Sequence, residues 1–190
     1  MSLSEEEMID ILHKTEALEE GHFLLSSGLH SDRYVQCAKV FQYPDIANKL
    51  CKKLADKLNA FSFDKIVGPA MGGILPAYEI SKILSKPNVF AERKDGKMKF
   101  RRGFKIEPEE NILIIEDVVT TGGSAKEVIE EIEEHGAKVT AVSSIINRTQ
   151  GEDVFEVPYI SLLELDVNNY EPSSCPLCEK NIPLVKPGSR

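Results

Sequence analysis

The sequence predicts an α/β fold, in which a mostly parallel central sheet carries helices on its faces. Short apolar runs alternate along the chain with segments whose apolar residues recur at helical spacing. The run 112–115 is apolar at every position, which is typical of a strand covered on both faces. Strands that alternate with helices in this way pair in parallel through right-handed crossovers.

Start and stop signals in the sequence place the helices. Ser4 and Glu7 form a capping box, and the apolar stripe behind them predicts a first helix that ends near Leu18. Gly136 is the expected stop of the last helix. Helices after the first are expected to begin at 43–45, at 72–73 and at 120–124. The expected strands are 65–68, 89–92, 112–115, 139–146 and 158–162.

The length of 190 residues suits one domain with its own core, so we expect a single domain over 1–190. Its 42% hydrophobic and 28% charged residues are typical of a soluble globular protein. No apolar stretch approaches the roughly 20 residues that span a bilayer. Residues 1–14 also lack the charged-then-apolar pattern of a signal peptide. We therefore expect a cytoplasmic protein that binds no membrane.

Charge is distributed unevenly along the chain. The net charge of −8 argues against a nucleic-acid-binding surface, yet 92–105 contains seven basic residues and two acids. Asp95-Gly96 is a strong hairpin signal within this segment. In the resulting register Lys94 faces Lys97, and like charges across a hairpin are destabilising unless an anion lies between them. The hairpin favours an anion such as pyrophosphate, and the alternative is an ordinary solvated charge run.

The segment 112–124, ILIIEDVVTTGGS, is the strongest candidate site. A buried strand leads into Glu116 and Asp117, and a turn rich in hydroxyls and glycine then opens a helix, whose N-terminus favours an anion. The turn contains no lysine, which excludes the nucleotide-triphosphate loop. Two carboxylates beside a phosphate-binding turn suit a ribose phosphate, because its hydroxyls can donate to the acids. The alternative is an ordinary strand-to-helix turn with a polar cap.

Four cysteines raise the question of metal binding. Cys175 and Cys178 have the CxxC spacing of half a zinc site, but the sequence has no second CxxC and no paired histidine cluster. Two copies of the chain could together supply four thiolates. Reduced thiols are the favoured interpretation for these two residues and for Cys37 and Cys51.

Several segments resemble one enzyme family. The string IIEDVVTTGGS closely resembles the phosphoribosyl-pyrophosphate signature of the type I phosphoribosyltransferases. Residues 21–34 look like the N-terminal segment of the orotate phosphoribosyltransferases within that family. Residues 66–74 look like the family's pyrophosphate loop, and 93–97 like its mobile basic loop. Together these segments cover most of the chain in family order.

The resemblance implies that the chain binds phosphoribosyl pyrophosphate and that Lys97, Glu116 and Asp117 are catalytic. The carboxylates would hold the ribose while its C1 develops positive charge, and Lys97 would neutralise the departing pyrophosphate. A Mg²⁺ cofactor, held mainly through substrate oxygens, would assist. The implied binding residues are Arg93, Lys94, Lys97, Lys99, Glu116, Asp117, Val118, Val119, Thr120, Thr121, Gly122, Gly123 and Ser124, with Ala70, Met71, Gly72 and Gly73 in the pyrophosphate loop.

Similarity to the orotate enzymes also implies the second substrate. Orotate would meet Arg148, whose guanidinium suits a planar acceptor edge, and Thr120, Ser27 and Gly28 would close its pocket. The family fold implies a small hood formed mainly by 1–40 and the C-terminal segment. It further implies that the hairpin 92–105 is mobile and that a homodimer shares its active sites.

Two departures from the family pattern keep other functions open. Ser26 stands where many orotate enzymes have a lysine, and Lys99 and Phe100 stand where many have His-Gly. One alternative is a phosphoribosyltransferase for a purine or another base. A second alternative is a non-catalytic regulator that senses the sugar phosphate, although the acidic N-terminal helix offers no DNA-binding face.

Overall fold

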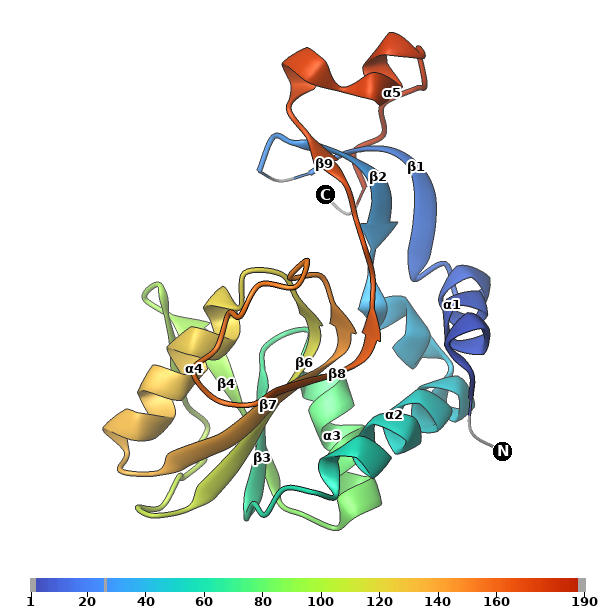
Figure 1. Cartoon of the computed structure of the whole chain (residues 1–190). Coiled ribbons are helices and arrows are strands. Elements are labelled where there is room, and N and C mark those ends of the chain that lie inside the picture. Colours follow the sequence, from blue (N-terminus) through green and yellow to red (C-terminus); the bar gives the residue numbers. More distant parts are fainter. Residues whose placement is uncertain (1–2, 26, 188–190) are drawn as a thin grey trace.

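The computed structural model describes residues 3–25 and 27–187 and contains a large and a small sheet (Figure 1). The strands of the large sheet are β3 (Lys65–Pro69), β4 (Asn88–Lys94), β5 (Lys97–Phe100), β6 (Asn111–Val119), β7 (Lys138–Asn147) and β8 (Tyr159–Glu164). They lie in the order β5-β4-β3-β6-β7-β8, and every neighbouring pair is parallel except β4 and β5. The predicted α/β fold with a mostly parallel sheet is confirmed.

Strand β6 shows how this sheet is covered on both faces. Leu113 and Ile115 belong to one buried apolar cluster, whereas Ile112 and Ile114 belong to a second. Successive side chains of a strand point to opposite faces, so the two clusters fill the layers on either side of the sheet. All four side chains are 0% exposed, which explains the uninterrupted apolar run in the sequence.

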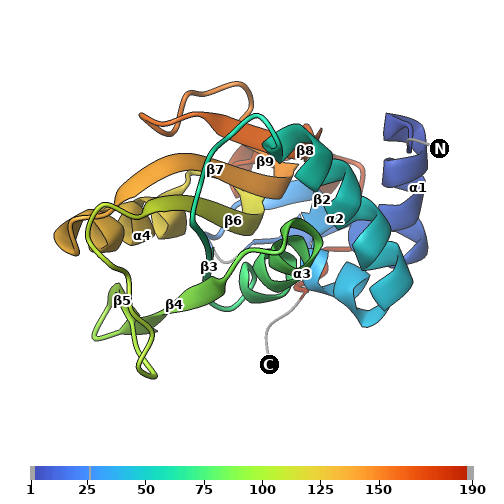
Figure 2. The same ribbon diagram turned by 90° about the horizontal axis from the view of Figure 1, so that it is seen from below.

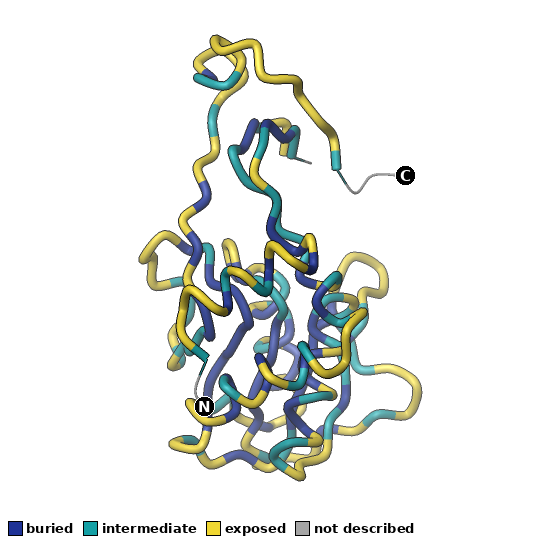
Figure 3. Tube along the Cα trace, turned by 90° about the vertical axis from the view of Figure 1, so that its right-hand side faces the viewer, coloured by how far each residue is buried: buried dark blue, intermediate teal, exposed yellow. Residues whose placement is uncertain are grey.

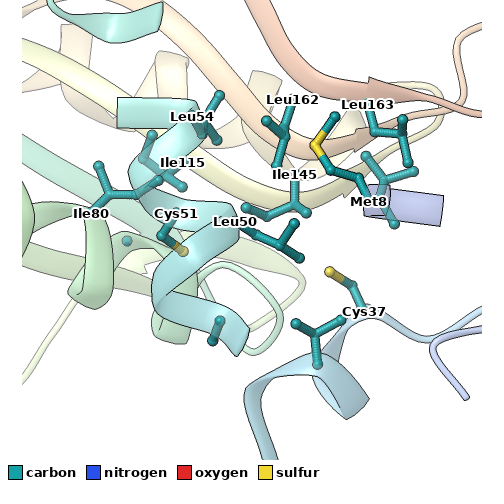
Figure 4. Packing of buried hydrophobic residues seen from close by; sticks show 14 of the residues in the cluster. Met8, Cys37, Leu50, Cys51, Leu54, Ile80, Ile115, Ile145, Leu162 and Leu163 are labelled. Carbon is teal, nitrogen blue, oxygen red and sulfur yellow. The ribbon is translucent and has the colours of Figure 1, made fainter. Parts of the chain in front are cut away.

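Helices form both of these outer layers. The apolar stripes of α2 (Pro44–Leu58) and α3 (Ile74–Leu84) join the first cluster, and that of α4 (Gly123–Glu134) joins the second (Figure 2). Leu54 of α2 and Ile80 of α3 lie together against the sheet in Figure 4. The three helices begin within a residue or two of their expected positions.

Helix α1 (Glu5–Lys14) packs on the same core through Met8 (Figure 4). It begins with the expected capping box. It ends at Lys14, so the predicted end near Leu18 is wrong. Glu16 takes a left-handed φ of 55°, which turns the chain out of the helix, and Leu18 then pairs with Val35 in a sheet.

The small sheet lies at the top of Figure 1 and consists of β1 (Leu18–Leu24), β2 (His30–Val35) and β9 (Asn169–Tyr170), all antiparallel. A 3₁₀ helix (Cys37–Gln42) connects β2 to α2. After β9 the chain forms a short tail that contains α5 (Pro176–Glu179). Figure 3 shows that this tail is mostly exposed, whereas buried residues are concentrated in and around the large sheet.

The three strands of the small sheet are absent from the sequence-based expectations, because their patterns do not alternate cleanly. In β1 the order of buried and exposed positions is interrupted by a register shift between Glu20 and Phe23. Its third strand, β9, has only two residues. No helix among the described residues is long and apolar enough to cross a membrane.

Candidate active site

The carboxyl end of β6 carries the two acids inside the strand itself. Glu116 is 7% exposed, and burial, together with the charge of Asp117, raises its pKa to about 8. Burial also raises the pKa of Asp117, although its Oδ1 accepts a 2.9 Å hydrogen bond from the N–H of Val118. The pair is therefore poised to take up donors or positive charge, either of which would offset the cost of burying the carboxylates.

The turn from β6 to α4 lies at the N-terminus of α4, where the helix dipole is positive, and it lines a pocket. Gly122 has a φ of 73°, and a Cβ there would lie 2.8 Å from the Phe155 ring, so only glycine fits. The first helical bond in this turn joins Lys126 N–H to Gly122 O, which leaves the preceding N–H groups open toward a ligand. A pocket of about 280 Å³ lies here. Its lining residues are Arg93, Glu116, Val118, Val119, Thr120, Thr121, Gly122, Gly123, Ser124 and Glu127.

The turn from β3 to α3 lies against the acids. A Cβ at Gly72 would collide with the carboxylate of Asp117, and one at Gly73 would lie 2.7 Å from Ile115 O. The Ala70–Met71 peptide is cis, and the Met71 side chain is 83% exposed. Among the described residues the N–H groups of Met71 and Gly72 have no acceptor, so this turn also offers donors to an anion. The structure thus brings together both predicted anion-binding turns and the acid pair.

The basic hairpin has the predicted register, in which Lys94 pairs with Lys97. Two of its predicted substrate-binding cations, however, are engaged by α4. Arg93 donates two hydrogen bonds of 3.0 Å to the Glu127 carboxylate, and Lys99 binds Glu131 and, at 3.0 Å, Glu134.

Lys97 lines a second pocket of about 260 Å³ beside acidic residues of α4, which shares Glu127 with the pocket of the turn 120–124. Within the parts of the chain that the structure describes, Lys94 and Lys97 form no ion pair. The structure therefore places Arg93 at the pocket of the β6–α4 turn but leaves Lys94, Lys97 and Lys99 outside its lining.

Arg148 follows the last residue of β7 and faces the small sheet. Its backbone N–H donates to Val119 O at 2.8 Å, which fixes it beside the end of β6. Burial lowers the pKa of its guanidinium, and the charge of Asp32 on β2 opposes this effect. Within the described residues its buried Nε has no hydrogen-bond partner. A planar cation with an unsatisfied buried donor is suited to an anionic ligand.

The remaining predicted base contacts lie in the β1–β2 turn. Gly28 has a φ of 88° and open space around its Cα, and the Leu29 N–H donates to Ser27 Oγ at 3.4 Å. Ser26 lies outside the described residues.

Sequence reasoning missed Glu127, which lines the pocket and holds Arg93. Its position one helical turn after Ser124 was the available signal.

Comparison with known proteins agrees with this geometry. Residues 40–179 match the family model described as a phosphoribosyl transferase domain. The chain belongs to the phosphoribosyltransferase family. It is 52% identical over 181 residues to an orotate phosphoribosyltransferase of Thermotoga maritima, covering 95% of this chain and 97% of that protein. It is 48% identical over 188 residues to one from Caldanaerobacter subterraneus subsp. tengcongensis, covering 99% of both.

Solved phosphoribosyltransferases share the fold. The crystal structure of orotate phosphoribosyltransferase from Aeropyrum pernix matches this chain with a TM-score of 0.69 and 24% identity, covering 83% of this chain and 93% of that one. The predicted resemblance to orotate phosphoribosyltransferases is confirmed by the relatives near 50% identity, which span nearly the whole chain.

Proposed function

We propose that this phosphoribosyltransferase moves the 5-phosphoribosyl group of phosphoribosyl pyrophosphate to orotate, forming orotidine 5'-phosphate and pyrophosphate in pyrimidine synthesis. The single observation that carries the proposal is the contact between Gly72 and Asp117. It joins two anion-binding turns across a pair of carboxylates, so a ribose with an anion at each end fits between them. The names and identities of the full-length relatives support orotate as the acceptor.

The reaction breaks the bond between C1 and the pyrophosphate oxygen and forms a bond from C1 to a ring nitrogen of orotate. Positive charge develops on the ribose and negative charge on the leaving group. Asp117 and Glu116 can accept hydrogen bonds from the ribose hydroxyls and stabilise the positive ring. The turn over 120–124 can hold the 5-phosphate through N–H groups and hydroxyls, and 70–73 the pyrophosphate.

Glu116 contributes to this stabilisation through its raised pKa of about 8. At neutral pH it is largely protonated before substrate binds, so it costs less to keep buried. Approach of positive charge favours its ionised form, with its proton released to the solvent in the open pocket, so its interaction with the ribose is strongest as the ring becomes cationic. Such a change between ground state and transition state is what accelerates a chemical step.

Lys97 is proposed to act on the leaving pyrophosphate from a neighbouring subunit. Lys97 lies beside the acids of α4 in its own chain and does not line the pocket of the turn 120–124, although Arg93 of the same hairpin does, so we propose that a second copy brings it to a substrate. The unpaired Lys94 and Lys97, facing each other across the hairpin, would then bind the pyrophosphate between them. We propose a homodimer with shared active sites on this ground, in which the hairpin 92–105 moves to reach its partner.

Mg²⁺ is proposed as the cofactor. It prefers oxygen ligands and keeps several waters, and the pyrophosphate and ribose of the substrate supply such oxygens. The anion-binding turns offer mainly N–H groups and hydroxyls, so these residues fit a complex in which the substrate itself holds the ion. When bound, the ion would neutralise charge on the leaving group.

Base recognition is proposed to fall on Arg148, with Thr120, Ser27 and Gly28 around it. The buried Nε of Arg148 has no hydrogen-bond acceptor among the described residues, and the carboxylate of orotate could accept a hydrogen bond from it. The chain would then form a single catalytic domain over residues 1–190, in which the small sheet serves as a hood over the base pocket. Cytoplasmic residence stays a prediction of the sequence.

A panel of bases tests the proposal. The protein is incubated with phosphoribosyl pyrophosphate, Mg²⁺ and orotate, adenine, hypoxanthine, xanthine or uracil in turn, and released pyrophosphate is measured. Orotate is expected to be the one base of this panel that gives turnover, and the Asp117→Ala variant should abolish that turnover. Turnover with a purine but not orotate would contradict the proposed acceptor. Tight binding of phosphoribosyl pyrophosphate without turnover on any base would favour a regulator instead.

A further inference from the structure

The C-terminal tail is attached to the small sheet at a cluster of four metal-ligating side chains. His22 of β1, His30 of β2, Cys175 and Cys178 each offer one ligand atom, and these atoms all lie within 4.8 Å of one another. The histidines come from paired strands, whereas the cysteines come from the tail (Figure 1). We propose that this cluster is a structural Zn²⁺ site of the Cys₂His₂ type, formed within one chain.

The distances between the ligand atoms match a tetrahedral zinc site. Cys175 Sγ lies 3.6 Å and Cys178 Sγ 3.8 Å from His22 Nε2, and Cys178 Sγ lies 3.4 Å from His30 Nδ1. Ligands at normal zinc bond lengths stand about 3.6 Å apart for nitrogen and sulfur. The two ring nitrogens are 2.8 Å apart, against about 3.4 Å expected around zinc, so a small shift of one ring completes the site.

A backbone carbonyl orients one of the histidines for metal binding. His22 Nδ1 lies 2.8 Å from Ile182 O. A carbonyl can only accept, so Nδ1 carries the proton and the lone pair of Nε2 is free for the cluster, where His30 Nδ1 lies 2.8 Å away and the two sulfurs lie 3.6 and 3.8 Å away. Zinc-bound histidines commonly donate their other N–H to a carbonyl in this way. The acceptor lies in the tail, so the orientation of His22 depends on the same segment that supplies the thiols.

Burial and charge also favour a divalent cation. His22, His30 and Cys175 are 2%, 6% and 1% exposed, whereas Cys178 is exposed and leaves a path for an ion to enter. Two thiolates and two neutral imidazoles carry a charge of −2, which one Zn²⁺ neutralises. A Cys₂His₂ set is a common closed donor set for structural zinc, with no open position for catalysis.

The tail needs such an attachment because it has almost no core of its own. Within 171–187 only Cys175 is buried, while Ile182, Leu184 and Val185 are 38%, 45% and 50% exposed. Two hydrogen bonds of 2.8 Å between Val185 and β1 add little on their own. Small segments without an apolar core are commonly held by a metal or by disulfides. The zinc ion would take the place of a core.

The proposed site differs from the sequence-based interpretation of the CxxC motif. That interpretation found no paired histidines, because His22 and His30 stand eight residues apart in the sequence, outside the usual metal-ligand spacing. The β1–β2 hairpin, which pairs Leu24 with His30, brings the two rings together. The proposed ligands also flank the turn 25–29, so the metal would fix both ends of the predicted base-binding segment.

Metal analysis of the full-length protein, purified without chelators and without added metal, tests the proposal. About one zinc ion per chain is expected, and reconstitution with Co²⁺ should give the visible bands of a tetrahedral site together with thiolate-to-cobalt charge transfer. Cys178→Ser and His30→Gln should each lower zinc affinity at least tenfold. Cys37→Ala, which removes a thiol from the core of the large sheet, is the matched control and should keep full metal content.

Three results would overturn the inference. One is failure to bind zinc on titration, and another is a Cys175–Cys178 disulfide in the native protein by mass spectrometry. The third is one zinc per two chains that His30→Gln leaves unchanged, because this would indicate four thiolates from two copies. Amide hydrogen exchange gives a readout independent of activity. A chelator should speed exchange in 22–30 and 171–187 by tenfold or more and leave β6 unchanged.

Discussion

The two sheets of this chain are stabilised by different means. The large sheet is buried between two apolar clusters, and its central strand β6 has four consecutive side chains that are 0% exposed. The small sheet and the tail contain few buried apolar residues and are joined by hydrogen bonds and by the His–Cys cluster that we propose binds zinc. The turns proposed to bind the sugar phosphate follow strands of the large sheet, and so does Arg148. The β1–β2 turn, which is proposed to close the base pocket, lies in a region with little core and can vary more easily.

Truncation of the core of the large sheet should have the largest effect on stability. Leu54→Ala, at a side chain that is 0% exposed, is expected to lower the free energy of unfolding by about 2–5 kcal/mol. Leu184→Ala in the tail, where the side chain is 45% exposed, should change it by less than about 0.5 kcal/mol. Urea unfolding measures both. Equal losses would mean that the tail has a core of its own.

Replacement of the hairpin lysine separates chemistry from stability. Lys97→Ala is expected to lower kcat by about 10²–10³-fold, the cost of losing one charge that stabilises the transition state. Its unfolding midpoint should stay unchanged, since Lys97 is exposed and forms no described ion pair. Lys82→Ala, an exposed lysine on α3, is the matched control. Wild-type kcat in Lys97→Ala would remove this residue from the mechanism.

Loss of Arg148 should weaken base binding and spare the sugar phosphate. Arg148→Ala is expected to raise KM for orotate by roughly ten- to hundredfold, since a hydrogen bond to a charged group contributes about 1.5–3 kcal/mol. The KM for phosphoribosyl pyrophosphate should stay unchanged, because the turns proposed to bind this substrate, 70–73 and 120–124, do not include Arg148. Arg148→Lys should restore little of the loss, since ammonium lacks the planar fork. A parallel rise in both KM values would contradict this division of labour.

The buried Glu116 should impose a pH dependence on the stability of the large sheet. Its pKa is about 8 in the folded chain against 4.5 as the reference value, so between these pH values the folded state holds the extra proton. Stability should therefore fall as pH rises from 4.5 to 8 and level off above 8. Glu116→Gln should remove up to about 1.4 kcal/mol per pH unit of this slope in urea unfolding without substrate. If the free energy of unfolding had the same slope against pH in the wild type and in Glu116→Gln, Glu116 would not be the source of this pH dependence.

The large sheet was predictable because its signals are local. The apolar run of β6, the glycine-rich turns and the Asp95-Gly96 hairpin each specify their own conformation, and the structure has them at the expected positions. The approach of Gly72 to Asp117 then follows from parallel strands whose carboxyl ends share one edge. Family motifs added the identity of the ligand, which these geometric signals leave open.

The third strand of the small sheet, the His–Cys cluster and the contacts of the basic hairpin could not be predicted, because their partners are distant in sequence. β9 joins β2 from a distant part of the chain, and His22 meets Cys175 across a separation of 153 residues. Arg93 and Lys99 looked free for an anion, but they bind Glu127 and Glu131 of α4. These acids lie one helical turn apart on one face of α4. The sequence therefore predicted the helix, but it did not predict that the basic hairpin packs against this face.

The glycine at position 72 has a consequence for laboratory evolution. A Cβ there would collide with the Asp117 carboxylate, so a side chain at position 72 would displace an acid that is proposed to hold the ribose and is expected to lower activity. Gly28, by contrast, has no atom of the described residues within 4 Å of the position that a Cβ would take, apart from its chain neighbours, although its φ of 88° favours glycine. A search for enzymes that accept other bases would therefore vary the side chains beside Gly28, keep Gly28 itself and leave Gly72 fixed.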